Sequence, residues 1–205
     1  MLIRSVETDK RGKDRLVLVL EDGRRVRARA EDVLRLGLSA GSDIDEETEL
    51  KLAAAVKRSS ARATAVNVLS FKAYSKQGLK KRLVEKGISE EEADDSADWL
   101  ENIGLLNDSE YAVLIREHYL KKGYGASRIR QEMSKRGIDR ELAKELTEEL
   151  EVDDAISRYI ESRLKGKQPE RDDIRRLTDA LARRGHTYED IRSALRRYAG
   201  EFDDF

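Results

Sequence analysis

The side chains of this sequence whose number and spacing best suit a function are its lysines and arginines. The function that they suit is the binding of anions. They gather in two stretches, 71–87 and 121–136, and an acidic stretch follows each one. Guanidinium and ammonium groups bind phosphate and carboxylate oxygens. We therefore predict contact with DNA phosphates or an acidic protein surface; the alternative is a charged face exposed only to water. The predicted binding cations are Lys72, Lys76, Lys80, Lys81, Lys86, Lys121, Lys122, Arg128, Arg130, Lys135 and Arg136, with Arg183 and Arg184 later in the chain.

The sequence has no set of residues typical of catalysis or of metal binding. Cys is absent, which excludes disulfides, thiolate metal sites and cysteine nucleophiles. The two histidines, His118 and His186, lie far apart in the sequence, whereas a zinc site needs about four ligands. No combination of nucleophile, base and oxyanion donor is apparent. We predict that the protein is not an enzyme and carries no cofactor or metal.

The composition is strongly charged but balanced. Among 205 residues, 41 are Lys or Arg and 42 are Asp or Glu, and the charged fraction of 40% exceeds the usual value of about 25%. The longest apolar run, Leu16 to Leu20, is far shorter than the roughly 20 residues that span a bilayer. The N-terminus lacks a signal-peptide pattern. We expect a helix-rich, cytoplasmic protein that is monomeric and does not contact a membrane.

A short glycine motif recurs three times, at Gly87, Gly137 and Gly185, with spacings of 50 and 48 residues. In each copy an apolar and a basic residue precede the glycine, and a bulky residue and a helix N-cap residue follow it. A glycine with positive φ ends one helix, and a Ser, Asp or Thr two residues later begins the next. The motif predicts a structural turn between consecutive helices in each repeat.

A further helix is expected before each of these pairs, over 61–71, 108–122 and 153–164. The predicted fold is mainly α: tandem three-helix repeats in an elongated, curved array, preceded by a small N-terminal β-hairpin or meander with helices. The expected domains are an N-terminal region over 1–58 and repeats over 59–107, 108–151 and 152–205.

The N-terminal region contains a hairpin signal. Two alternating segments, 15–20 and 24–30, flank Asp22-Gly23, a dipeptide typical of type I′ turns. Residues 2–6 could add a third strand, and helices are expected over 31–38 and 45–57. The arginines of the second arm form a further basic candidate site, or they protect an edge strand from pairing. They are Arg24, Arg25, Arg27 and Arg29.

Other residues suit packing better than binding. The segment Gly123-Tyr124-Gly125 could present helix amides to a phosphate, or it is a plain turn between helices. Tyr124 could stack on a base of single-stranded DNA, or it packs within the protein. Core positions are expected on one stripe of the helix over 108–122 and near the end of the preceding helix. They are Tyr111, Leu114 and Ile115, and Trp99, Leu100, Ile103, Leu105 and Leu106. His118 shares the stripe and is expected to be a core or a surface histidine rather than a ligand or base.

The motifs together resemble the RecX family of bacterial recombination regulators over residues 60–151, and more loosely beyond. The family pattern places a serine-capped helix before Leu-x-x-Lys-Gly, then Gly-Leu-Leu-Asn/Asp-Asp-x-x-Tyr-Ala, then Lys-Gly-x-Gly-x-x-Arg-Ile. The matching segments are Tyr74-Ser-Lys-Gln-Gly-Leu-Lys-Lys-Arg-Leu-Val-Glu-Lys-Gly87, Leu100-Glu-Asn-Ile-Gly-Leu-Leu-Asn-Asp-Ser-Glu-Tyr-Ala112 and Lys122-Gly-Tyr-Gly-Ala-Ser-Arg-Ile129.

The resemblance implies a regulator of homologous recombination, DNA repair and the SOS response. Its partners would be RecA protein and the RecA–DNA filament. It would restrain ATP hydrolysis, strand exchange and stimulated repressor cleavage. Two alternatives remain open from the residues alone. The protein could bind DNA directly and without sequence preference, or it could be a helical scaffold for another protein partner.

Overall fold

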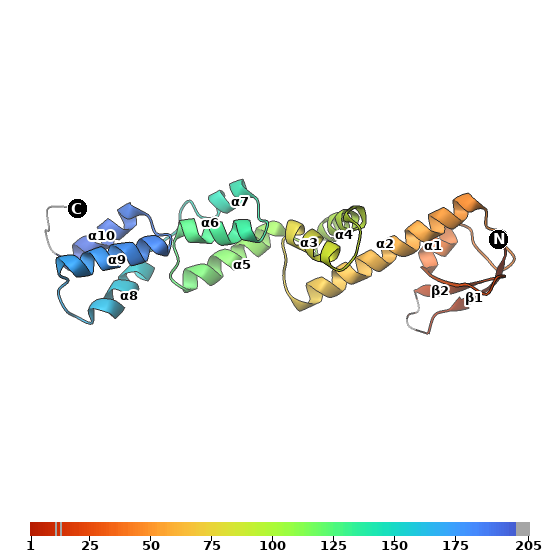
Figure 1. Ribbon diagram of the computed structural model, residues 1–205, viewed down its shortest axis with the longest axis horizontal. Helices are drawn as coiled ribbons and strands as arrows, with labels where there is room; N and C mark the ends of the chain where they lie inside the picture. The colour runs from red at the N-terminus through yellow and green to blue at the C-terminus, as the bar shows by residue number, and fades with distance from the viewer. Residues whose placement is uncertain (11, 13, 200–205) are drawn as a thin grey trace. The chain divides into compact units, whose positions relative to one another are not determined.

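The structure is a computed structural model that describes residues 1–10, 12 and 14–199, and these fold into two compact units (Figure 1). The first unit comprises Met1–Lys72 and Leu79–Leu105. The second comprises Ala73–Gly78 and the chain from Leu106 onward. The described chain is mainly helical, with ten helices and a small sheet at its N-terminus, so the predicted fold class is confirmed.

The N-terminal sheet is antiparallel and has the strand order β1-β2-β3. The predicted hairpin is present, and the Leu20 amide donates to the Arg24 carbonyl at 2.9 Å. Its turn is not of type I′, which requires positive φ at both Asp22 and Gly23, because only Gly23 of the two has a positive φ, at +84°. Leu18 and Ala28 are buried on the inner face, and the alternate arginines are exposed, as the alternating pattern predicts. The strands are β1 (Ile3–Thr8), β2 (Arg15–Leu20) and β3 (Arg25–Arg29), and helix α1 (Ala30–Arg35) follows them.

Helix α2 (Glu46–Phe71) is a single helix of 26 residues, so the prediction of separate helices over 45–57 and 61–71 is wrong. Asp45 caps its N-terminus by accepting a hydrogen bond from the Thr48 amide at 2.8 Å. Ser59 does not interrupt it, because the Ser59 hydroxyl donates to the Val56 carbonyl of the same helix at 3.0 Å. The N-terminal part of α2 packs on the sheet, and α2 also packs along α4 (Glu90–Asn102).

The remaining helices follow the predicted pattern of pairs joined at glycine. Gly87, Gly137 and Gly185 have φ values of +86°, +77° and +87°, so the three expected turns are confirmed. Ser89, Asp139 and Thr187 each accept a hydrogen bond from an amide in the first turn of the next helix. The pairs are α3 (Lys76–Glu85) with α4, α6 (Ala126–Lys135) with α7 (Arg140–Glu145), and α9 (Arg171–Arg183) with α10 (Tyr188–Ala199).

In the second unit a further helix precedes each pair, and each group of three has its own core. Helix α5 (Asp108–Lys121) packs with α6 and α7 around Ile115, Ile129 and Met133. Helix α8 (Asp153–Leu164) packs with α9 and α10 around a second apolar cluster. Leu120 and Leu150 pack against both clusters, which joins the two groups.

Some of the expected core positions are wrong. Leu114 is 57% exposed, because the buried face of α5 is set by Ala112 and Ile115 instead. His118 is exposed, which agrees with the surface alternative. Near the end of α4, Leu100 and Leu106 are buried as predicted, and Trp99 and Tyr111 are partly buried. Ile103 and Leu105 are exposed, because the helix ends at Asn102 and Gly104 turns the chain with a φ of +74°.

None of the helices within the described residues combines the length and apolar character that a membrane span requires.

Candidate functional site

Glu132 on α6 contacts three of the cations that the sequence predicts to bind a partner. Its carboxylate is only 9% exposed and lies 3.2 Å from an Arg128 nitrogen, 3.0 Å from Lys135 Nζ and 2.8 Å from Arg136 Nη1. The Tyr119 hydroxyl also donates a hydrogen bond to it at 3.0 Å. These three cations therefore neutralise a buried carboxylate as well as facing the exterior.

The electrostatics of this cluster favour the ionised carboxylate. Hydrogen bonds from Arg136, then from Lys135, lower the pKa of Glu132 from 4.5 to about 2, against the opposing effect of burial. The same Glu132 hydrogen bond raises the pKa of Arg136. Both charges are therefore present throughout the neutral range.

Arg184 joins the two helix groups of the second unit. Its guanidinium donates to the Lys122 carbonyl at 3.1 Å and lies over the rings of Tyr124 and Tyr159, with centroid distances of 5.3 and 4.6 Å. Cation–π contacts of this kind stabilise a partly buried arginine. Arg184 therefore has a structural role whatever else it binds.

The segment around Gly123 and Gly125 is a turn that docks on the next helix group, and its amides are occupied. The Gly125 amide donates to the Arg184 carbonyl at 2.9 Å, and the Ser127 amide donates to the Gly185 carbonyl at 3.1 Å. One of the two alternatives from the sequence was that these amides bind a phosphate. A phosphate bound there would have to displace the Arg184 and Gly185 carbonyls. Tyr124 packs between Tyr119 and Arg184, in agreement with the packing alternative.

His186 belongs to the same junction. It is buried, and its Nε2 lies 3.1 Å from the Gly123 carbonyl oxygen. Burial lowers the pKa of His186, so the ring is held mainly neutral near pH 7. Its place within the junction indicates a packing role.

A groove with a cavity volume of about 270 Å³ opens beside this junction. Its charged lining is entirely positive, and Ala155 and Tyr159 complete the walls. We call it the cationic groove. Its cations are Lys121, Lys122, Arg158 and Arg184.

Arg158 is the residue of this groove that sequence reasoning missed. It lies on α8, and its Nε donates to the Asp154 carbonyl at 3.2 Å. The charges along α8 are mixed, so no local pattern marks the residue. Only the packing of α8 against the end of α5 reveals it.

The remaining predicted cations do not converge in this groove. Lys80 pairs with Asp94 at 3.1 Å, and Arg130 donates to the Thr147 hydroxyl at 3.0 Å. Lys81, Lys86 and Arg183 are exposed, and no ion pair within 4 Å involves them in the part of the chain that the structure describes. Lys72 is exposed and Lys76 is partly buried, and both lie at the loop between α2 and α3.

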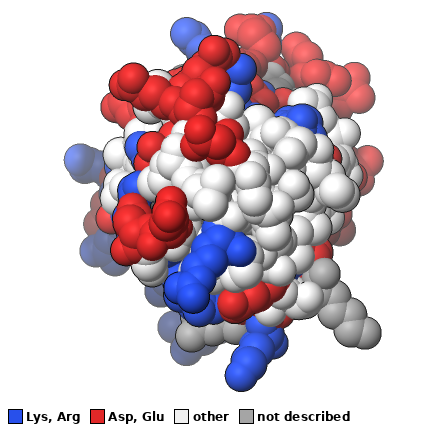
Figure 2. Space-filling model, turned by 90° about the vertical axis from the view of Figure 1, so that its right-hand side faces the viewer, with Lys and Arg blue, Asp and Glu red and all other residues white. Residues whose placement is uncertain are grey.

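The hairpin arginines are mostly compensated by neighbouring acids. Arg24 contacts Asp22 at 2.6 Å and Glu49 at 3.3 Å. Arg25 and Arg27 lie 2.7 Å from Glu7 and 3.5 Å from Asp9, whereas Arg29 forms no ion pair among the described residues. Figure 2 shows both signs of charge around an uncharged area on the face it displays, so that face is not uniformly basic.

The described residues include no group of three or more His, Asp or Glu side chains arranged to hold a metal ion. The cationic groove could bind anionic groups on a partner.

Comparison with known proteins identifies the chain. A family model described as the first three-helix domain of RecX matches residues 61–100, and one for its second three-helix domain matches residues 107–146. "Regulatory protein RecX" of Shigella dysenteriae is 30% identical over 151 residues, which cover 66% of this chain and 89% of that protein. The protein of the same name from Caldanaerobacter subterraneus is 26% identical over 166 residues, covering 81% and 84%.

Solved structures show the same fold. The crystal structure of a regulatory protein RecX superposes with a TM-score of 0.80 at 21% identity, covering 96% of this chain and 98% of that one. The crystal structure of RecX from Lactobacillus salivarius gives a TM-score of 0.58 at 21% identity, covering 69% and 96%. Both family domains match in order, and a relative is 30% identical over most of its own length; the chain therefore belongs to the RecX family of regulatory proteins.

Proposed function

We propose that this protein binds RecA and the RecA–DNA filament and restrains the recombinase, ATPase and coprotease activities of RecA. Membership of the RecX family supports a regulatory role. The observation that carries the proposal is the cationic groove, in which four cations from α8 and from the C-terminal ends of α5 and α9 line one cavity without an acidic residue. Such a groove suits a surface that presents carboxylates or phosphates.

The repetition of helix groups supports binding to a polymer. Turns of the same type recur at spacings of 50 and 48 residues, so similar helix ends are presented more than once along the chain. A filament also repeats its surface. Several moderate contacts on one chain act as linked sites, and linkage strengthens binding without any new type of contact.

The proposal is tested by charge reversal in the cationic groove. The variant carries Lys121→Glu, Lys122→Glu and Arg158→Glu, and it retains Arg184 because that residue joins the two helix groups. We expect its affinity for RecA filaments on single-stranded DNA to fall by about tenfold or more, since a tenfold change needs only about 1.4 kcal/mol. Co-sedimentation with the filament measures this affinity.

A matched control carries the same change of charge outside the groove, at Arg4→Glu, Lys51→Glu and Lys57→Glu. Its affinity should stay close to that of the unmodified protein, and both variants should keep their helicity. Undiminished filament binding by the groove variant would contradict the proposal.

Direct, sequence-independent DNA binding is a second candidate, because an acid-free cationic groove also suits phosphates. It predicts equal affinity for bare DNA and for filaments, with a steep dependence on salt. Tight binding to filaments and weak binding to bare DNA at about 150 mM salt would favour the RecA proposal instead.

A further inference from the structure

A second acid-free cavity lies in the first unit, between the sheet and α2. Its positive lining comes from Arg15 on β2 and from Arg27 and Arg29 on β3. Arg15 and Arg29 are directly opposite each other in the strand pairing, and Arg27 shares their face two residues away. Like charges in directly opposite positions destabilise a sheet. The pair is therefore unfavourable unless an anion lies between or beside the two side chains.

Neither Arg15 nor Arg29 has that anion within the protein. Among residues 1–10, 12 and 14–199, neither forms an ion pair within 4 Å, and neither donates a side-chain hydrogen bond. Arg27 is 3.5 Å from Asp9, a longer separation than the 2.7 Å between Arg25 and Glu7. Two of the three arginines that face this cavity, Arg15 and Arg29, thus lack a compensating acid among the described residues, and the third, Arg27, has only this longer contact.

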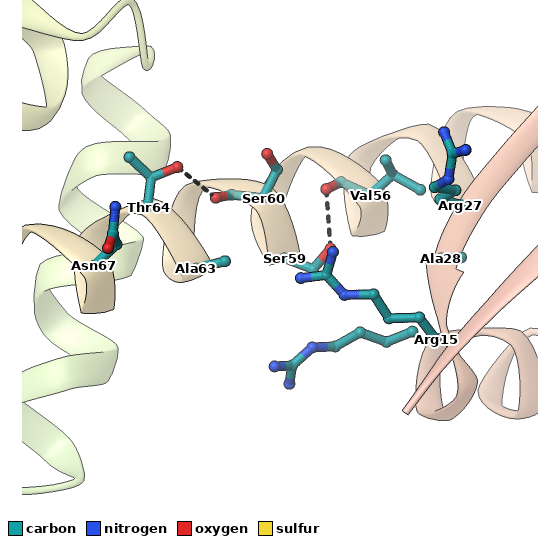
Figure 3. Close-up of a pocket in the computed structure, with 10 residues that line it drawn as sticks. Arg15, Arg27, Ala28, Val56, Ser59, Ser60, Ala63, Thr64 and Asn67 are labelled. Carbon is teal, nitrogen blue, oxygen red and sulfur yellow. Dashed lines mark hydrogen bonds between the residues drawn. The ribbon is translucent and has the colours of Figure 1, made fainter. Parts of the chain in front are cut away.

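The opposite wall is polar and built from small side chains of α2. Ser59, Ser60, Ala63, Thr64 and Asn67 line it over about two helical turns (Figure 3). The hydroxyls of Ser59 and Thr64 donate to carbonyls of their own helix, so their lone pairs face outward and the hydroxyls can rotate to donate.

The cavity volume is about 380 Å³, and no Asp or Glu contributes to its lining. Ala28 and Val56 supply apolar surface at the base. Figure 3 shows the arginine side chains extending toward the wall that α2 forms. We call this cavity the arginine groove.

We propose that the arginine groove binds the phosphodiester backbone of a nucleic-acid strand. Three guanidinium forks, an amide and three hydroxyls offer more donors than the roughly four hydrogen bonds that one carboxylate accepts. Consecutive phosphates supply that many acceptors, and guanidinium groups bind phosphate in a bidentate manner. The groove lining contains no aromatic side chain, so binding is through the backbone and independent of base sequence.

This inference is independent of the RecA proposal. It concerns residues of the first unit, whereas the cationic groove lies in the second, and it requires no RecA. Its test can therefore fail while regulation of RecA stands, and the reverse also holds.

The absence of cysteine allows a local test in the full-length chain. Ser60→Cys places a single thiol in the groove, and a benzophenone attached to it crosslinks a labelled 20-nucleotide single strand that lies there. Leu50→Cys is the matched control, because Leu50 is exposed on the same helix but does not line the groove. We expect crosslinking from Ser60→Cys and little from Leu50→Cys.

The arginines are tested in the Ser60→Cys protein. Arg15→Gln with Arg29→Gln should reduce the crosslink by about tenfold, whereas Arg4→Gln with Arg25→Gln, which changes the charge equally, should leave most of it. Unlabelled single-stranded or duplex DNA should compete, and the strand that competes at lower concentration identifies the form bound. Equal crosslinking from both cysteines, no effect of Arg15→Gln with Arg29→Gln, or stronger competition by poly-glutamate than by DNA would overturn the inference.

Discussion

Glu132 shows that a single buried carboxylate can offset part of the positive charge of a basic helix. Arg128, Lys135 and Arg136 all contact it, so their charges are partly used to offset the penalty of burying an anion. The net positive charge presented by α6 is therefore smaller than its sequence suggests. This partial neutralisation is the physical reason to place the proposed RecA-binding surface at the acid-free groove beside Lys121 and Lys122 and not on α6.

We predict that Glu132→Gln lowers the free energy of unfolding by about 2 kcal/mol at pH 7, because charged hydrogen bonds at a buried site are lost. Urea denaturation followed by circular dichroism measures the change. Glu149→Gln, at an exposed position of the same unit, is the control and should change stability by less than about 0.5 kcal/mol.

The same variant gives a pH test with a defined sign. The pKa of Glu132 is lowered to about 2 in the folded protein, so its stabilisation is complete above pH 4.5 and is lost as the pH falls toward 2. The stability difference between the unmodified protein and Glu132→Gln should therefore shrink between pH 5 and pH 3. A difference that grows on acidification would show that Glu132 is not held ionised by its neighbours.

Whether a residue could be predicted from the sequence depended on how local its determinants are. Gly87, Gly137 and Gly185 could be, because a helix end and the next N-cap lie within a few residues. The Glu132 cluster joins α5 to α6, and Arg158 reaches its groove only through the packing of α8. These contacts link residues that no short pattern connects. The exposed Leu114 was misplaced because the helical period alone did not decide which side of α5 is buried.

At the scale of elements, the glycine turns do more than end helices. The turn at Gly185 docks against the start of α6, where a Cβ on Gly185 would lie 2.3 Å from the Arg128 amide nitrogen. A Cβ on Gly137 would lie 2.8 Å from Gln77 Cβ, so the turn after α6 docks on the start of α3 in a similar way. The Ser75 hydroxyl donates to the Arg136 carbonyl at that contact.

Helix α2 shows that local sequence patterns do not always predict where a helix begins and ends. The sequence predicted two helices, over 45–57 and 61–71, yet α2 is continuous because the Ser59 hydroxyl bonds within it and Ala61 and Ala65 are buried beyond it. The prediction failed because tertiary packing of the alanines outweighs the weak helix propensity of serine.

A comparison of Gly87 with Gly185 separates two effects on stability, the cost of a positive φ and the cost of a clash with a neighbouring helix. Gly87 and Gly185 have nearly equal φ values of +86° and +87°, but a Cβ at Gly87 meets nothing within 4 Å. We predict that Gly87→Ala destabilises the fold by about 1–2 kcal/mol, the penalty for a left-handed alanine. Gly185→Ala should add about 1–3 kcal/mol from the clash with α6.

Thermal unfolding, together with hydrogen exchange of the amides that flank each glycine, measures both effects. Equal destabilisation by the two variants would mean that the contact between the turn and α6 contributes nothing to stability.

At the scale of the whole molecule, the two units each contain a candidate binding surface. The chain has a net charge of −1, yet each unit contains a groove whose charged lining is entirely positive. Overall charge therefore says little about binding here, because cations gather locally in the two grooves although many other cations are paired with acids. A regulator of this kind would act through several moderate contacts, and loss of one groove should weaken the effect without abolishing the fold.

The most direct test of the central claim is a titration of RecA with this protein while ATP hydrolysis on single-stranded DNA is recorded. We predict that the rate of hydrolysis falls at amounts of protein well below one per RecA. The variant with Lys121→Glu, Lys122→Glu and Arg158→Glu should need a concentration about tenfold higher for the same effect. A rate that stays unchanged at equimolar protein would contradict the account.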